Sequence, residues 1–168
     1  QAITARQSID SDKVKFVFPN VMVENPTSGA LEEHNVTAFA GAIDSVLSYH
    51  QSASQEGLGS RVKDLALDIG SDIDLLTANQ INPVALQQGR GYIFKSDYTC
   101  SSNTSLTQNV VRKAKDYFAR RFYDALQFYI SKPIDEKLYK DITRTLSDIL
   151  RQEATNRRIG NSKGGDAW

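Results

Sequence analysis

The stretch 81–95, which reads INPVALQQGRGYIFK, constrains the fold more than any other part of the sequence. Its run 82–87 is followed by a Gly-Arg-Gly bend and then by the run 91–99, which opens with the apolar and aromatic residues Tyr92, Ile93 and Phe94. The bend glycines, Gly89 and Gly91, allow a positive φ angle or a bulge where the chain turns. The pattern therefore predicts two strands joined by a tight bend.

Two long amphipathic helices are predicted in the C-terminal third of the chain. Apolar residues recur every three to four positions from 108 to 131, and again from 136 to about 153. Pro133 separates the two patterns, because proline cannot donate a main-chain hydrogen bond inside a helix. Asp135 stands where the N-terminal cap of the second helix belongs.

The N-terminal half alternates between strand and helix patterns. The predicted elements are a strand over 13–23 with a bend at Pro19, a loop over 24–33, a helix over 35–50, a strand over 61–69 and a short helix over 71–80. Together with the later elements, they predict an α/β fold in which a mixed sheet of about four strands packs with about four helices.

The chain is predicted to hold a single domain over 13–155. Residues 1–12 are polar and show no period, and 156–168 are basic and then glycine-rich, so both segments are expected to be flexible. The chain opens on Gln1, and its only methionine is Met22. We therefore expect that it is a piece of a longer polypeptide.

Charge is distributed unevenly along a chain whose net charge is zero. Residues 1–105 carry seven Lys/Arg against twelve Asp/Glu, whereas residues 106–168 carry thirteen against eight. Such a dipolar subunit suits head-to-tail contact between copies, or a basic face that meets an acidic partner. A chance distribution is the alternative.

No catalytic or metal centre is predicted. Cys100 is the only cysteine, which excludes an internal disulfide and a thiolate metal cage, and the only histidines are His34 and His50. The acidic group Asp68, Asp72 and Asp74 lacks the glutamate-terminated spacing of a calcium loop. Neither Gly57-Leu58-Gly59 nor Gly89-Arg90-Gly91 is accompanied by the further residues of a nucleotide-binding loop.

Nucleic-acid and membrane partners are also not expected. Basic residues share the predicted helix 108–131 with several aromatic residues, a combination found in nucleic-acid binders. However, the aromatic residues follow the apolar stripe of the helix, which predicts that they belong to a core. No apolar run approaches the length of a membrane span.

The order of these motifs resembles the C-terminal domain of contractile tail sheath proteins of myoviruses and related injection machines. The motif residues that carry the resemblance are Ile81, Asn82, Pro83, Gly89, Gly91, Asn109, Pro133 and Asp135. The likeness runs from about residue 13 to 153 and is strongest over 79–153. The chain departs from the family pattern where Val111 replaces the first of two arginines and where Ser96 replaces a glycine.

The resemblance implies a structural subunit without enzymatic activity or cofactor. Subunits of this family form stacked hexameric rings around a tail tube, and arms from neighbouring subunits add strands to the sheet of this domain. Contraction then drives the tube through the host envelope, and the viral genome is ejected. The implied partners are further sheath subunits, the tail tube protein, and the baseplate and tail terminator proteins, in a virion tail assembled in the host cytoplasm.

Three further expectations follow from the resemblance. The family continues with more strands after the second long helix, so this chain is expected to be truncated and monomeric in dilute solution. Basic residues of the two long helices are expected to face the tube or a neighbour: Arg112, Lys113, Lys140, Arg144 and Arg151. The alternatives are a module of another contractile system, such as a type VI secretion-like sheath, or another virion structural protein.

Overall fold

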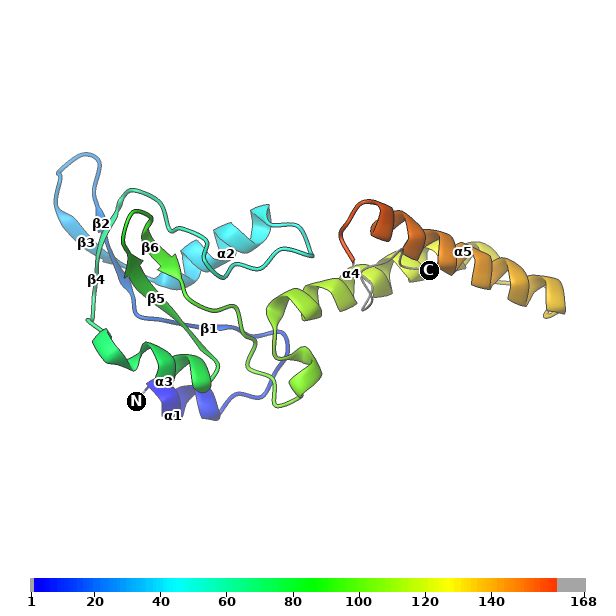
Figure 1. Ribbon diagram of the computed structural model, residues 1–168, viewed down its shortest axis with the longest axis horizontal. Coiled ribbons are helices and arrows are strands. Elements are labelled where there is room, and N and C mark those ends of the chain that lie inside the picture. Colours follow the sequence, from blue (N-terminus) through cyan, green and yellow to red (C-terminus); the bar gives the residue numbers. More distant parts are fainter. Residues whose placement is uncertain (1, 160–168) are drawn as a thin grey trace. The chain divides into compact units, whose positions relative to one another are not determined.

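The computed structural model describes residues 2–159, and the chain divides into two compact units, Gln1–Lys113 and Ala114–Trp168 (Figure 1). The first unit contains two three-stranded sheets, and the second contains most of two long helices. The predicted α/β class, with two long C-terminal helices, is confirmed. The single domain predicted over 13–155 stays a prediction.

The motif-bearing strand lies at the centre of the first sheet. Strand β5 (Ile81–Gln87) runs parallel to β1 (Phe16–Phe18) on one side and antiparallel to β6 (Gly91–Phe94) on the other. Five consecutive residues of β5, from Ile81 onward, are buried. A strand buried on both faces shows a continuous apolar run instead of alternation, which is why the sequence signal here was strong.

The second sheet contains an edge strand that the sequence analysis missed. Its order is β3 (Leu31–His34), β2 (Val21–Glu24) and β4 (Val62–Leu65), with both neighbours antiparallel to β2. The predicted loop over 24–33 is therefore wrong at its C-terminal end. All four β3 residues are exposed, so no apolar alternation marks the strand.

The predicted strand over 13–23 is divided into β1 and β2 at Pro19. Proline has no main-chain N–H to contribute to a strand ladder, so a sheet strand commonly ends there. Asn20 accepts a main-chain hydrogen bond from Ala66 at 2.9 Å, just after β4. This contact connects the turn to the second sheet, so the predicted strand contributes to two sheets where one was expected.

Helix α2 (Val36–Val46) packs against the sheets and is capped by Asn35, whose side chain accepts a hydrogen bond from the Thr37 N–H at 2.9 Å. Val36 and Ala40 of this helix belong to the main core. The buried residues of that core are Val21, Val36, Ala40, Leu58, Val62, Val84 and Phe94. It joins both sheets and α2 in one apolar cluster.

A second, smaller core involves the N-terminal segment. The short helix η1 (Gly70–Asp72) leads into α3 (Ile73–Ala78), whose Leu76 packs with Ile69 and Ile81. Residues 1–12 were expected to be flexible, but residues 2–7 form helix α1 (Ala2–Gln7). Ala2 and Ile3 pack against this core, and apolar burial there explains why a short helix without a clear period is ordered.

The second unit is a pair of helices joined by a short turn. Helix α4 (Asn109–Leu126) is followed by the single-turn helix η3 (Gln127–Tyr129), and α5 (Glu136–Thr155) begins after Asp135. The prediction that Asp135 caps the second helix is confirmed, since its carboxylate accepts a hydrogen bond from the Leu138 N–H at 2.7 Å. Of the C-terminal segment predicted over 156–168, residues 160–168 lie outside the described part of the chain.

Candidate functional site

The motif residues in β5 hold the first sheet together from inside. Ile81 and Asn82 are fully buried, and Pro83 is nearly so. The amide nitrogen of Asn82 donates to the Phe16 carbonyl at 3.0 Å and to the Tyr98 carbonyl at 2.8 Å, and the amide oxygen accepts from the Tyr98 N–H at 2.5 Å. A buried amide with its donors and acceptor engaged fixes the strands on either side of it. The role of Asn82 is therefore structural.

The bend glycines adopt the backbone conformation that the sequence predicted. Gly89 and Gly91 both have φ of 79°, a region that residues with a Cβ rarely adopt. Between them, the Arg90 side chain donates a hydrogen bond to the Gln55 carbonyl at 2.8 Å. This contact holds the 54–58 segment beside β6.

That segment closes one edge of the first sheet. Phe94 and Leu58 donate main-chain hydrogen bonds to Glu56 and Tyr92 at 3.1 and 2.9 Å, and Gln55 donates to Phe94 at 2.7 Å. The outer side of β6 is therefore paired by its own chain. A further strand cannot be added there without displacing the segment.

The opposite edge, at β1, is open in the described part of the chain. The Val17 main chain forms no hydrogen bond there outside the β1–β5 ladder. Beside this edge lies a groove of about 300 Å³, here called the β1 groove. It is lined by Lys13, Lys15 and Val17 of the β1 segment, Thr37, Ala40, Gly41 and Asp44 of α2, and Asn109, Arg112 and Lys113 of α4.

Small residues of α2 keep the β1 groove open. Ala40 and Gly41 form part of the helical wall, and a Cβ atom placed on Gly41 would meet no heavy atom within 4 Å. The groove thus places the unpaired edge of β1 next to small residues of α2. An extended peptide can join such an edge through main-chain hydrogen bonds.

A partly buried charge cluster lies beside the groove and shares Lys15, Asp44, Asn109 and Lys113 with its lining. Lys15 Nζ lies 2.6 Å from a carboxylate oxygen of Asp97 and 2.8 Å from one of Asp44. Asn109 donates from its amide to Asp97 at 3.1 Å, and Lys113 lies 3.4 Å from Asp44. The family-motif residue Asn109 therefore ties the start of α4 to this cluster.

Asp97 is held in its charged form. Burial alone would raise its pKa, but the Lys15 ammonium and the N–H donors of Ala53 and Asn109 outweigh that effect, and the pKa of Asp97 lies below its ordinary value. Its side chain is only 3% exposed. The cluster thus fixes β1, the 53–54 turn and α4 around one carboxylate.

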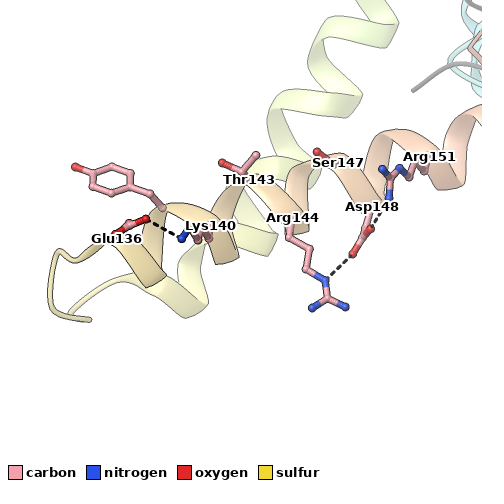
Figure 2. A pocket seen from close by; sticks show the side chains of 8 residues that line it. Glu136, Lys140, Thr143, Arg144, Ser147, Asp148 and Arg151 are labelled. Atoms are coloured by element: carbon pink, nitrogen blue, oxygen red, sulfur yellow. Dashed lines mark ion pairs between the residues drawn. The ribbon is translucent and has the colours of Figure 1, made fainter.

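The predicted basic residues fall into two separate groups. Arg112 and Lys113 line the β1 groove in the first unit. Lys140, Arg144 and Arg151 lie along one side of α5 in the second unit, beside a groove of about 460 Å³ (Figure 2). The structure therefore brings the members together only within each group.

Acidic residues accompany the basic side of α5. Lys140 pairs with Glu136 at 2.7 Å, and Asp148 lies 3.9 Å from Arg144 and 3.8 Å from Arg151 (Figure 2). These side chains are mostly exposed, so each pair contributes little stability. This side of α5 keeps an excess of one positive charge and remains accessible to a partner.

The residues that were considered for chemistry lie in separate places. Cys100 is fully buried, and burial raises the pKa of its thiol, which disfavours the reactive thiolate. His34 lies on the exposed strand β3, 3.7 Å from the Glu32 carboxylate. Within residues 2–159, no group of three or more His, Cys, Asp and Glu side chains is placed to hold a metal ion. In the same range, no helix combines the length and apolar character needed to cross a bilayer.

Sequence reasoning missed the charged residues at the centre of both units. Lys15, Asp44 and Asp97 were not singled out, although an aspartate inside a predicted strand is a usable signal. In the second unit, the Glu153 side chain is 1% exposed and accepts hydrogen bonds from Tyr117, at 2.9 Å, and from Arg121. Tyr117 and Arg121 stand four residues apart on α4, which places them on one helix face.

Comparisons with solved structures identify the fold. The chain aligns with the sheath of an extracellular contractile injection system, the PVC sheath complex in its contracted state, with a TM-score of 0.79 and 16% identity over 99% of this chain and 48% of that one. It aligns with the contracted helical sheath of the anti-feeding prophage with a TM-score of 0.73 and 19% identity, over 90% of this chain and 43% of that one. It aligns with the crystal structure of a sheath tail protein from Desulfitobacterium hafniense with a TM-score of 0.67 and 13% identity, over 88% of this chain and 37% of that one.

These likenesses establish that the chain has the fold found in part of contractile sheath proteins. The chain spans less than half the length of these matched structures. A scan against protein-family models gives no match, and a search of curated proteins gives none either.

Proposed function

We propose that this chain is a structural subunit of a contractile sheath, and that its β1 groove accepts an extended arm from a neighbouring subunit. One observation carries the proposal: a fold shared with sheath proteins presents an open strand edge beside a groove. The neighbour's arm adds a strand next to β1, and main-chain hydrogen bonds supply strength that depends little on side-chain identity.

In this role the subunits stack as hexameric rings around a tail tube, and contraction drives the tube through a target envelope. The subunits move largely as rigid bodies between two packings, joined by the added strands. The partners are other sheath subunits, the tube, the baseplate and the terminator, in a virion tail assembled in the host cytoplasm. No nucleic acid, membrane, cofactor or catalytic step takes part, so the purified chain should turn over no small molecule.

Filling the β1 groove tests the proposal. The substitution Gly41→Leu places a large side chain over the open edge, so the arm cannot enter and helical tubes should be absent by electron microscopy. The same change raises helix propensity by about 1 kcal/mol, so folding should not suffer. Electron microscopy is done on the protein in the form in which it occurs naturally, and thermal unfolding of the same variant is recorded in parallel.

Ala42→Leu is the matched control, since Ala42 is the next residue of α2 and does not line the groove. It should form tubes as the unmodified protein does. Tubes of normal frequency and length from Gly41→Leu would refute arm entry at this edge.

A second candidate is the sheath of an injection system that is not a virus. It is favoured by one observation: the matched structures include sheaths of the anti-feeding prophage and of an extracellular contractile injection system. The role of the chain in assembly is the same for both candidates. Imaging of the intact particle distinguishes them, because a genome-filled head marks a virion.

The basic side of α5 is proposed to face an acidic tube. The triple variant Lys140→Glu, Arg144→Glu and Arg151→Glu should co-sediment less with tail tubes than the unmodified protein does. Its binding to tail tubes should also depend less on salt, because these exposed charges act through an attraction that salt screens. Lys63→Glu, an exposed reversal on β4, is the control and should leave binding unchanged. Unchanged binding of the triple variant would mean that this side of α5 is only solvated.

A further inference from the structure

The turn between α4 and α5 exposes large apolar side chains. Residues 127–134, here called the hairpin tip, include Phe128, Ile130 and Ile134, which are 74%, 69% and 80% exposed. The ammonium of Lys132 lies over the Phe128 ring, 3.8 Å from its centroid. No acidic residue occurs in the tip. It is therefore an apolar, cationic projection of a kind that usually marks an interaction surface.

A second apolar surface lies in the first unit, between α3 and the sheets. This groove, here called the α3 groove, has a volume of about 520 Å³. Its apolar lining is contributed by Leu65, Ile69, Ile73, Ala85 and Leu86, and Leu86 is 64% exposed. Asp64 and Asp68 add two carboxylates, and no basic residue lines the groove.

The carboxylates of the α3 groove are held in place. Asp64 accepts a hydrogen bond from the Leu65 N–H at 2.8 Å and one from the Tyr92 hydroxyl at 3.3 Å. Asp68 accepts from the Gly70 N–H at 2.9 Å. The groove therefore presents fixed negative charge beside an apolar surface, which is the chemical complement of the hairpin tip.

We propose that the hairpin tip of one copy of this chain docks into the α3 groove of a second copy. Phe128 and Ile130 fill the apolar floor, while Lys132 meets the carboxylates of Asp64 and Asp68. The proposal rests on the proposed function in one respect: a sheath brings many copies side by side, where such a contact can repeat.

Size and charge favour a second copy over other occupants. The two surfaces are complementary in sign, and the chain as a whole is acidic before residue 106 and basic after it. A single tip buries far less than the roughly 1,200 Å² of a stable interface, so an isolated pair should be short-lived. In an array the contacts act together, and their combined strength exceeds that of each one.

Disulfide trapping detects such a short-lived contact in solution. Ile130→Cys on the tip and Leu86→Cys at the groove are made on separate chains of different mass, mixed and mildly oxidised. Native Cys100 is fully buried and should not react. Both substituted residues are exposed, so the variants should fold normally. We expect the mixed disulfide to form several times faster than with Val46→Cys, a partner exposed on α2 outside the groove.

A charge exchange then tests the ionic part of the contact. Adding Lys132→Glu to the tip chain should lower the trapping rate about threefold, the effect of one exposed ion pair. Adding Asp64→Lys to the groove chain as well should restore it. Restoration excludes a purely apolar encounter, because neither change alters the apolar surfaces.

Three outcomes would overturn the proposal. Trapping at the rate of the Val46→Cys control means that the tip does not select the groove, and binding of the tip to anionic lipid vesicles in that case assigns it to a membrane surface. An internal disulfide in a chain that carries both cysteines means that the tip occupies its own groove. Failure of the charge exchange to restore trapping removes the ionic pairing.

This test separates the contact from the sheath role. Trapping is read on free chains, whereas sheath assembly is read as tubes by electron microscopy. If sheath tubes form but the disulfide is not trapped, only the tip contact is refuted. If the disulfide is trapped but no sheath tubes form, only the sheath role is refuted.

Discussion

Asp97→Asn is expected to lower the free energy of unfolding by about 3 kcal/mol, because the Lys15 ammonium loses its fully buried partner and keeps only the partly exposed Asp44. The variant keeps the shape of the side chain but loses its charge, so the effect isolates electrostatics from packing. Chemical denaturation at pH 7 measures it. Asp44→Asn is the comparison variant, since its side chain is 25% exposed, so that removing its charge should destabilise less than removing that of Asp97.

The stability difference between the unmodified protein and this variant should depend on pH. The pKa of Asp97 is lowered in the folded state, so its contribution is fully present above the unfolded value of about 4 and is lost as pH falls through the lower folded value. The stability difference between the unmodified protein and Asp97→Asn should therefore shrink below about pH 4. A difference that stays constant down to pH 2 would contradict the assignment.

Glu153→Gln is expected to destabilise the helical pair by about 3 kcal/mol. Glu153 is the one buried residue among the described residues 114–159. It accepts hydrogen bonds from Tyr117 and Arg121, and Arg158 lies 3.4 Å from its second carboxylate oxygen. Removing the carboxylate charge leaves Arg121 without its buried partner. Hydrogen exchange measured by mass spectrometry should show faster exchange over α5.

Glu136→Gln provides the control for that experiment. Its carboxylate pairs with Lys140 at 2.7 Å, but the side chain is exposed, so the change should leave exchange rates unaltered. Equal protection in Glu153→Gln and in the unmodified protein would show that the Glu153 charge is not needed to hold α4 against α5.

The parts of the fold that bury apolar surface were predictable from the sequence. Strands β5 and β6, their glycine bend and helices α2, α4 and α5 each carry a continuous or periodic apolar pattern, and all are present. Strand β6 ends at Phe94 instead of 99, and α4 ends at Leu126 instead of 131. Strand β3 was missed because Leu31–His34 is exposed throughout. Helix α1 was missed because tertiary packing of Ala2 and Ile3, rather than its own pattern, orders it.

The candidate sites could be predicted only in part. The motif positions Asn82 and Asp135 were identified by pattern, and the structure gives both a local hydrogen-bonding role. The β1 groove was not predictable, because it arises where three segments distant in sequence meet around Lys15 and Asp97. Single-sequence periodicity carries no information on such long-range pairing. The hairpin tip was likewise hidden, since its apolar residues continue the pattern of the preceding helix.

The two edges of the first sheet differ, and this difference limits how many further strands the sheet can accept. Because residues 54–58 seal the β6 side, the sheet can be lengthened in one direction only, at β1. Within the described residues, this sheet therefore has one acceptor edge for an incoming strand, and growth through that edge is polar. If arms are added at this edge as proposed, successive additions produce an array with two chemically different ends, one of which retains an unfilled acceptor edge.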